Sequence, residues 1–96
     1  MKHIIMVNFR DDADQAAIDA FLQQAPKSLA CGPFAAVVFG VGEKVFGSSM
    51  DWGFIADVGS ADDIHEWSAC EAHAEMLAAL QPIVASLSTM SMVASA

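Results

Sequence analysis

Three short segments of this chain are apolar on both of the faces that a β-strand presents. Residues 3–9, 34–39 and 52–58 are rich in β-branched and aromatic side chains and have the length of strands. In the first segment, Ile5 belongs to one face and Ile4 to the other. Side chains alternate between the faces along a strand, so both faces of these strands must be covered. This requirement constrains the fold more than any other feature of the sequence.

The sequence offers two helical regions to cover the strands. Asp14 is a good N-cap for the first, and Pro26 is expected to end or bend it. The second runs from residue 60 to about residue 80, with a break foreseen near residues 70–71, and it starts with a capping box of Ser60 and Asp63. The apolar stripe of the first helix consists of Ile18, Phe21, Leu22 and Ala25.

The order of elements predicts the fold class. After the glycine-rich loop of residues 40–50 and the second helical region, residues 84–93 have the texture of a final strand. The order β-α-β-β-α-β is the ferredoxin-like arrangement, an α+β fold with one four-stranded antiparallel sheet and both helices on one face. The chain has no third layer for the other face, so a second copy is expected to cover it, which makes a homodimer. A bound ligand or another protein is the alternative cover.

Composition narrows the functional classes. Of 96 residues, 55% are hydrophobic, the net charge is −8, and only four residues are basic. Four bases cannot form the basic stripe that nucleic acids require, and anionic membrane surfaces are disfavoured for the same reason. No segment has the roughly 20 apolar residues of a membrane span, and the N-terminus does not resemble a signal peptide. These features predict a cytoplasmic protein in which Cys31 and Cys70 are reduced thiols.

Three stretches of the chain resemble the stress-responsive A/B barrel (Dabb) domain family. Residues 1–10, MKHIIMVNFR, are similar to the first strand of these domains, and residues 51–58, DWGFIADV, are similar to their third strand. Residues 67–73, WSACEAH, resemble their helix motif, aromatic-x-x-His-Pro-x-His. The resemblance implies a single domain over residues 1–96 that dimerises through its sheet into a dimeric α+β barrel. The family includes a polyketide cyclase, and a hydroxynitrile lyase has the same fold.

The same resemblance implies candidate catalytic residues. In the cyclase, a tyrosine and the last histidine of the helix motif carry out acid–base catalysis, and that histidine corresponds to His73. Trp67 occupies the tyrosine position, Cys70 the first motif histidine and Glu71 the usual proline. A first-strand histidine corresponds to His3. The chain contains no tyrosine, so a tyrosine-dependent cyclase mechanism does not transfer.

The periodicity of the second helical region also points to His73. Met76 and Leu80 follow it at helical spacing, and His3 shares a strand face with apolar residues, so both histidines are expected to border one cavity. An imidazole in a dry pocket suits proton transfer at a carbon beside a carbonyl. The open alternative is that each histidine is a core residue that hydrogen-bonds to backbone. The expected cavity lining is Ile5, Phe21, Trp52, Phe54, Trp67, Cys70 and Leu77.

Two functional hypotheses follow. The first is a cofactor-independent lyase, cyclase or isomerase that acts on a hydrophobic carbonyl compound, polyketide-like or aromatic, with His73 as the acid–base group and His3 as an auxiliary donor. The second is a non-catalytic module that binds a hydrophobic small molecule or acts in a stress response. No cofactor is expected. A metal site is disfavoured because the candidate ligands His3, His73, Asp51 and Asp57 lack metal-ligand spacing.

Overall fold

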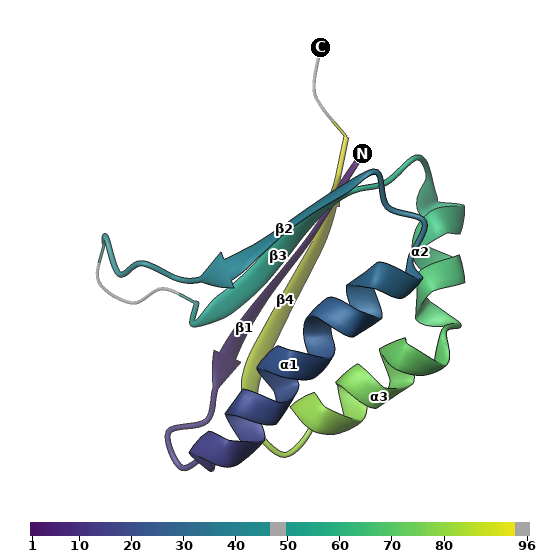
Figure 1. Cartoon of the computed structure of the whole chain (residues 1–96). Coiled ribbons are helices and arrows are strands. Elements are labelled where there is room, and N and C mark those ends of the chain that lie inside the picture. The colour runs from purple at the N-terminus through teal and green to yellow at the C-terminus, as the bar shows by residue number, and fades with distance from the viewer. Residues whose placement is uncertain (47–49, 94–96) are drawn as a thin grey trace.

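The computed structural model describes residues 1–46 and 50–93 and has two layers, a sheet and the helices on one of its faces (Figure 1). The four strands are antiparallel in the order β2-β3-β1-β4, which confirms the predicted ferredoxin-like α+β fold. The predicted loop over residues 40–50 lies partly outside the described residues, at 47–49. The elements are β1 (Lys2–Phe9), α1 (Gln15–Cys31), β2 (Ala36–Val41), β3 (Trp52–Asp57), α2 (Ala61–Ser68), α3 (Glu71–Leu80) and β4 (Val84–Met92).

Side chains along the central strands β1 and β3 alternate between the two faces of the sheet. His3 pairs with Ala56 on one side and with Ser91 on the other, and all three belong to the face that meets the helices. The next residue, Ile4, pairs with Ile55, and both belong to the opposite face. The core lies between the sheet and the helices, and its buried residues are Val7, Phe21, Ala25, Leu29, Trp52, Phe54, Ala56, Val58, Trp67, Met76, Leu80 and Ile83.

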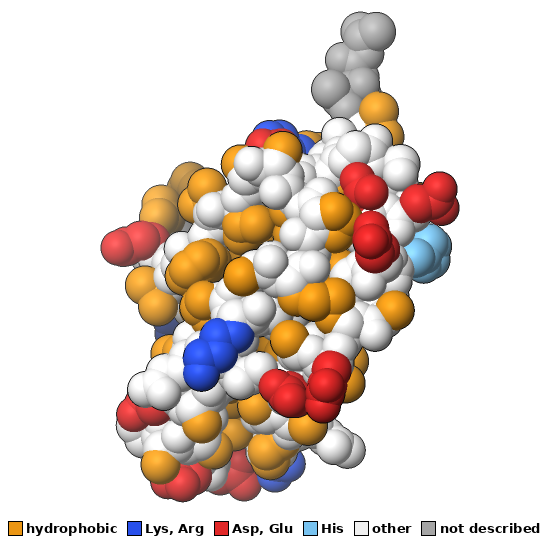
Figure 2. Space-filling model, turned by 45° about the vertical axis from the view of Figure 1, so that its right-hand side comes forward, with side chains coloured by type: hydrophobic (Ala, Val, Ile, Leu, Met, Phe, Trp, Pro, Cys, Tyr) orange, Lys and Arg blue, Asp and Glu red, His pale blue; other side chains and the backbone are white. Residues whose placement is uncertain are grey.

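The opposite face of the sheet, called the outer face below, is not covered by any helix of the described residues, 1–46 and 50–93. The molecule measures 39 × 34 × 17 Å along its principal axes. It is therefore a thin slab, with room for one sheet and one layer of helices. The large apolar side chains that remain exposed there are Met6, Val38, Ile55, Met90 and Met92. On the helical side of the molecule, by contrast, apolar side chains are interspersed with acidic ones (Figure 2).

Pro26 was expected to end or bend the first helix, and the first of these alternatives was wrong. Helix α1 continues through Pro26 to Cys31, although an interior proline removes a hydrogen bond and costs about 3 kcal/mol. Ala25, Ser28 and Leu29 are buried on either side of the proline. Their packing against the core outweighs the local cost of the proline, so tertiary contacts decide where the helix ends.

The predicted break in the second helical region is confirmed. Helix α2 ends at Ser68 and α3 begins at Glu71, with Cys70 as its N-cap residue in an extended conformation. The predicted capping box of Ser60 and Asp63 does not form, because the Ser60 side chain makes no capping hydrogen bond and the carboxylate of Asp63 accepts the backbone N–H of Gly59 at 2.9 Å. The break lets α3 turn and run beside α1 (Figure 1).

Candidate functional site

Trp67 organises the cluster in which the candidate catalytic residues lie. It belongs to the last turn of α2, and its indole is only 2% exposed. The indole Nε1 donates a hydrogen bond to the main-chain oxygen of Ser28 at 2.9 Å, which ties α2 to α1. Phe34 and Phe54 lie against the same indole with ring centroids 5.5 and 5.7 Å away. Aromatic pairs in these tilted or perpendicular arrangements stabilise a core beyond the area they bury.

His3 lies on β1 under this cluster and is 7% exposed. Its Nδ1 is 3.0 Å from the hydroxyl oxygen of Ser91 on the neighbouring strand β4, and its ring centroid is 6.0 Å from that of Trp67. Burial lowers the pKa of His3 below its ordinary value because the charged form loses water. His3 is therefore a neutral imidazole at pH 7, braced by a side chain from another strand.

His73 lies in the first turn of α3 and is half-buried. Its imidazole is edge-on to the indole of Trp67, with ring centroids 4.5 Å apart. Burial also lowers the pKa of His73, so this ring too is neutral at pH 7 and able to accept a proton. Of the two histidines, His73 is the one that water or a ligand can reach.

The two histidines share Trp67 as a neighbour. The sequence predicted that His3 and His73 border one cavity, and the structure places the buried indole of Trp67 in contact range of both rings. The buried indole therefore occupies the space between α2, α3 and β1 beside the two histidines.

The other predicted lining residues have different environments. Phe21, Trp52 and Phe54 are buried in the core, and Ile5 packs against it from β1. Leu77 was predicted on the buried stripe of its helix, and this was wrong, because the side chain is 44% exposed. Met76 and Leu80 face the core, and Leu77 lies about 100° around the helix from Met76, at the edge of that buried face.

The prediction of reduced thiols was also wrong, because Cys31 and Cys70 form a disulfide. Cys31 is the last residue of α1 and Cys70 is the N-cap residue of α3, and their Cα atoms are 6.7 Å apart. The sequence separation of 39 residues gave no indication of this proximity. In the chain-entropy picture, a crosslink over a loop of this length stabilises the folded state by about 4 kcal/mol.

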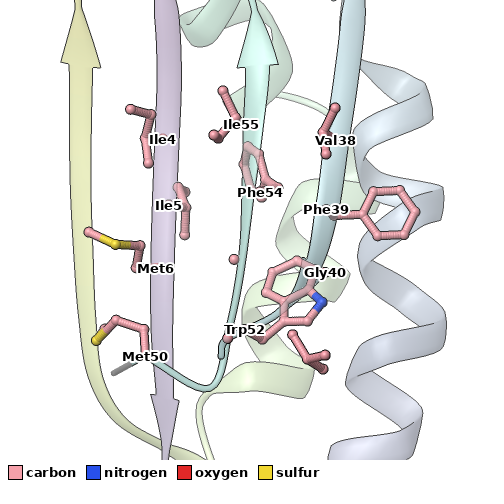
Figure 3. Close-up of a pocket in the computed structure, with 13 residues that line it drawn as sticks. Ile4, Ile5, Met6, Val38, Phe39, Gly40, Met50, Trp52, Phe54 and Ile55 are labelled. Carbon is pink, nitrogen blue, oxygen red and sulfur yellow. The ribbon is translucent and has the colours of Figure 1, made fainter. Parts of the chain in front are cut away.

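A second candidate site lies on the outer face of the sheet, where a shallow hollow of about 410 Å³ opens between β2, β3 and β1 (Figure 3). Gly40 and Gly53 are paired neighbours on β2 and β3, so no side chains fill the middle of the hollow. Met6, Val38 and Ile55 form its apolar rim. The predicted lining residues Ile5, Trp52 and Phe54 are among those that line it, and Ile4, Phe39, Val41, Gly42 and Met50 complete the lining.

Two further observations bear on the kind of site. Among residues 1–46 and 50–93, no three His, Cys, Asp or Glu side chains are arranged as metal ligands. In the same part of the chain, no helix is both long and apolar enough to cross a membrane.

No family model matches the sequence, and no curated protein matches it. Solved structures do match its fold. A dimeric ferredoxin-like protein of unknown function from Thermobifida fusca YX is 19% identical, with a TM-score of 0.80 over 93% of this chain and 85% of that one. A Dabb family protein from Mesorhizobium loti MAFF303099 is 12% identical, with a TM-score of 0.78 over 99% and 96%. A hydroxynitrile lyase from Passiflora edulis is 14% identical, with a TM-score of 0.74 over 93% and 87%.

The fold and these likenesses define a class, the ferredoxin-like α+β domains. Within this class the chain has a Dabb-type fold, which confirms the resemblance seen in the sequence at the level of architecture. At identities below 20%, the likeness concerns the fold and carries no activity with it.

Sequence reasoning missed several residues of both candidate sites. Ser91 and Ser28 hold His3 and Trp67, but a serine in a strand or helix gives no sign of its partner. Val38 and Met50 line the outer hollow. The alternation within β2 was a usable signal for Val38, because it separates the outer face from the face that meets the helices.

Proposed function

We propose that the chain forms a homodimer in which the outer faces of two sheets pack together and enclose a hydrophobic small molecule. Several observations support the pairing. The outer face carries apolar side chains on its central and edge strands, including Val38 at 71% exposure and Ile55 at 46%. Lys2 and Asp57, which lie on the same face, form an ion pair with each other and leave no isolated charge there. An exposed apolar patch of this kind is typical of an interface.

The hollow on the outer face is the single observation that carries the binding function. Its volume of about 410 Å³ lies within the usual range of small-molecule sites, roughly 300–1,000 Å³. Its lining is apolar, with glycines at the centre, which suits a flat or aromatic molecule more than a charged one. A second sheet over the hollow would exclude water and turn an open surface into a closed site.

Sedimentation and light scattering at micromolar concentration test the pairing, and fluorescence of the neutral probe N-phenyl-1-naphthylamine tests binding. Ile55→Asp should give a monomer that no longer enhances probe fluorescence, because two carboxylates would face an apolar interface. Leu77→Asp is the matched control, because Leu77 is exposed to a similar extent, 44%, but lies on the helical layer. A monomeric unaltered chain, or equal effects of both variants, would refute the proposal.

His73 favours a second candidate function, a cofactor-independent lyase, cyclase or isomerase acting on a hydrophobic carbonyl compound. The motivating observation is its reachable, neutral imidazole beside Trp67, and a hydroxynitrile lyase shares the fold. In cyanohydrin cleavage, His73 would take the hydroxyl proton as the carbon–cyanide bond breaks, and the leaving cyanide would be protonated to hydrogen cyanide. His3, braced by Ser91, would serve as the auxiliary donor.

Release of benzaldehyde from mandelonitrile is a direct assay for this chemistry. His73→Gln should abolish it, whereas His65→Gln, a change at an exposed position on α2, should leave it intact. Activity retained in His73→Gln would exclude the acid–base role. Two further predictions from the sequence remain predictions: a non-catalytic role in a stress response, and a cytoplasmic location.

A further inference from the structure

The disulfide Cys31–Cys70 joins the two segments that hold Trp67 and His73. Cys31 ends α1, three residues after Ser28, whose carbonyl oxygen accepts the hydrogen bond from the Trp67 indole. Cys70 lies midway between Trp67 and His73 in the sequence. Its backbone N–H donates to the Trp67 oxygen at 3.0 Å, and its own oxygen accepts the His73 N–H at 3.1 Å. The crosslinked residue Cys70 is thus hydrogen-bonded through its main chain to the main chains of Trp67 and His73.

Apart from the disulfide, this junction is held by hydrogen bonds, by the burial of Trp67 and by the packing of α3 on α1. The α2 and α3 helices are joined through only two residues, Ala69 and Cys70, and the helices have few contacts with one another. Beyond the disulfide, the Trp67–Ser28 hydrogen bond connects the junction to α1, while Gln24 and Glu75 are linked farther along α3 at 3.1 Å. The disulfide is the covalent link between the junction and α1, so breaking it leaves the Trp67–Ser28 hydrogen bond and the packing of α3 on α1 as the remaining ties.

The disulfide is also accessible to thiols. Cys31 is exposed and Cys70 is half-buried, so a thiolate in solution can approach the sulfur atoms. Exposed disulfides exchange with thiols more readily than buried ones. Accessibility combined with this position suggests a bond that is made and broken in function.

We propose that Cys31 and Cys70 form a redox-controlled latch that sets the position of Trp67 and so controls access to His73 and His3. In the disulfide form, the junction is fixed to α1 and the indole fills the space beside the histidines. In the dithiol form, the junction moves more freely and the indole leaves that space part of the time. This inference concerns the helical layer and does not depend on the proposed function of the outer face.

The chemistry of the latch is thiol–disulfide exchange. A thiolate of a dithiol reductant attacks one sulfur, the Cys31–Cys70 bond breaks, and a mixed disulfide forms. The second thiol of the reductant then resolves it, so two electrons and two protons reach the protein while the reductant becomes a disulfide. Oxidation runs in reverse, with a small-molecule disulfide such as glutathione disulfide as the electron acceptor.

Hydrogen exchange of the tryptophan indoles tests the latch with an internal control. The protein has two tryptophans, and Trp67→Phe assigns their indole N–H signals in a nitrogen–proton NMR spectrum. After treatment with dithiothreitol, the Trp67 indole should exchange with D₂O at least about tenfold faster than in the disulfide form. The rate of Trp52, which is buried on β3 against Phe21 of α1, should change little. Glutathione disulfide should restore the slow rate.

Each other outcome overturns the latch. An unchanged Trp67 rate would show that the bond has no influence on the indole, and equal acceleration of both indoles would show a purely structural crosslink. Failure of the disulfide to form in glutathione buffer, seen by intact mass, would refute it as well. In the variant Cys31→Ser/Cys70→Ser, the Trp67 indole should exchange as fast as in the reduced protein, and dithiothreitol should not change that rate. If the variant does not fold, the comparison of oxidised and reduced wild-type protein is the test.

Discussion

The imidazole of His73 stands perpendicular to the indole of Trp67, with an angle of 82° between the ring planes. The buried indole shields one side of the imidazole from water, and the other side remains reachable. This combination lowers the pKa of His73 while it leaves the ring open to a proton donor or a ligand. The tryptophan thus gives the histidine a partly dry environment without a closed pocket.

The first prediction concerns acid stability. His3 and His73 both have pKa values lowered from 6.5, so the folded protein binds fewer protons than the unfolded chain. The free energy of unfolding should therefore fall as the pH drops below about 6.5, and should keep falling until the lowered pKa values are passed. Urea unfolding between pH 7.5 and 5 measures this. His3→Gln/His73→Gln should flatten the dependence, and an unaltered slope would assign it to other groups.

The second prediction concerns the hydrogen bond between Trp67 and Ser28. Trp67→Phe removes the donor, leaves a buried carbonyl oxygen unpaired and opens a small void, so it should reduce the free energy of unfolding by about 2–4 kcal/mol. Ser28→Ala is the matched control. It keeps that carbonyl and removes only the hydroxyl at 3.2 Å, so its cost should be about 1 kcal/mol or less. Urea unfolding compares the two, and equal costs would contradict the assignment.

The third prediction separates the two glycines of the outer hollow. A Cβ at Gly40 would meet no atom within 4 Å, so Gly40→Val should fold normally, fill the hollow and abolish binding of N-phenyl-1-naphthylamine. A Cβ at Gly53 would lie 2.5 Å from the main-chain oxygen of Ile5. Gly53→Ala should therefore destabilise the protein by about 1–3 kcal/mol. Full probe binding by a folded Gly40→Val protein would place the probe elsewhere.

The fourth prediction concerns the interior proline of α1. Pro26→Ala restores a backbone donor within the helix, and the unfolded chain gains some freedom in return. The net result should be a protein more stable by about 1–3 kcal/mol. Thermal unfolding followed by circular dichroism measures this. A loss of stability would mean that the packing of Ser28 and Leu29 depends on the helix shape that the proline imposes.

The strands were the most predictable part of the fold. Alternation in residues 3–9 and 52–58 placed His3 and Phe54 on the face that meets the helices and Ile4 and Ile55 on the other, as the structure has them. Strand β2 was predicted over residues 34–39 and lies two residues later, at Ala36–Val41. It is an edge strand, and the apolar run in its sequence has no sharp boundary. Local pattern is sufficient here because the period of a strand is fixed by its backbone.

The candidate site was less predictable, because it depends on distances that local pattern does not encode. The resemblance pointed to His73. It did not show that the indole of Trp67 packs directly beside the His73 ring. Leu77 was misplaced because helical spacing alone does not show where the edge of the buried face lies. The pairing of Cys31 with Cys70 follows only from the way α3 folds back along α1. Each of these is set by tertiary packing.

The slab is only 17 Å thick, so a single sheet separates His3 from whatever lies against the outer face. If water lies against the outer face, it helps to stabilise the protonated imidazole of His3 across the sheet. If an apolar surface replaces that water, this stabilisation is lost, and the pKa of His3 should fall further. Protonation of His3 and covering of the outer face would then oppose one another. By linkage, acid would weaken the covered state, and dilution of the protein would raise the pH at which His3 takes up its proton.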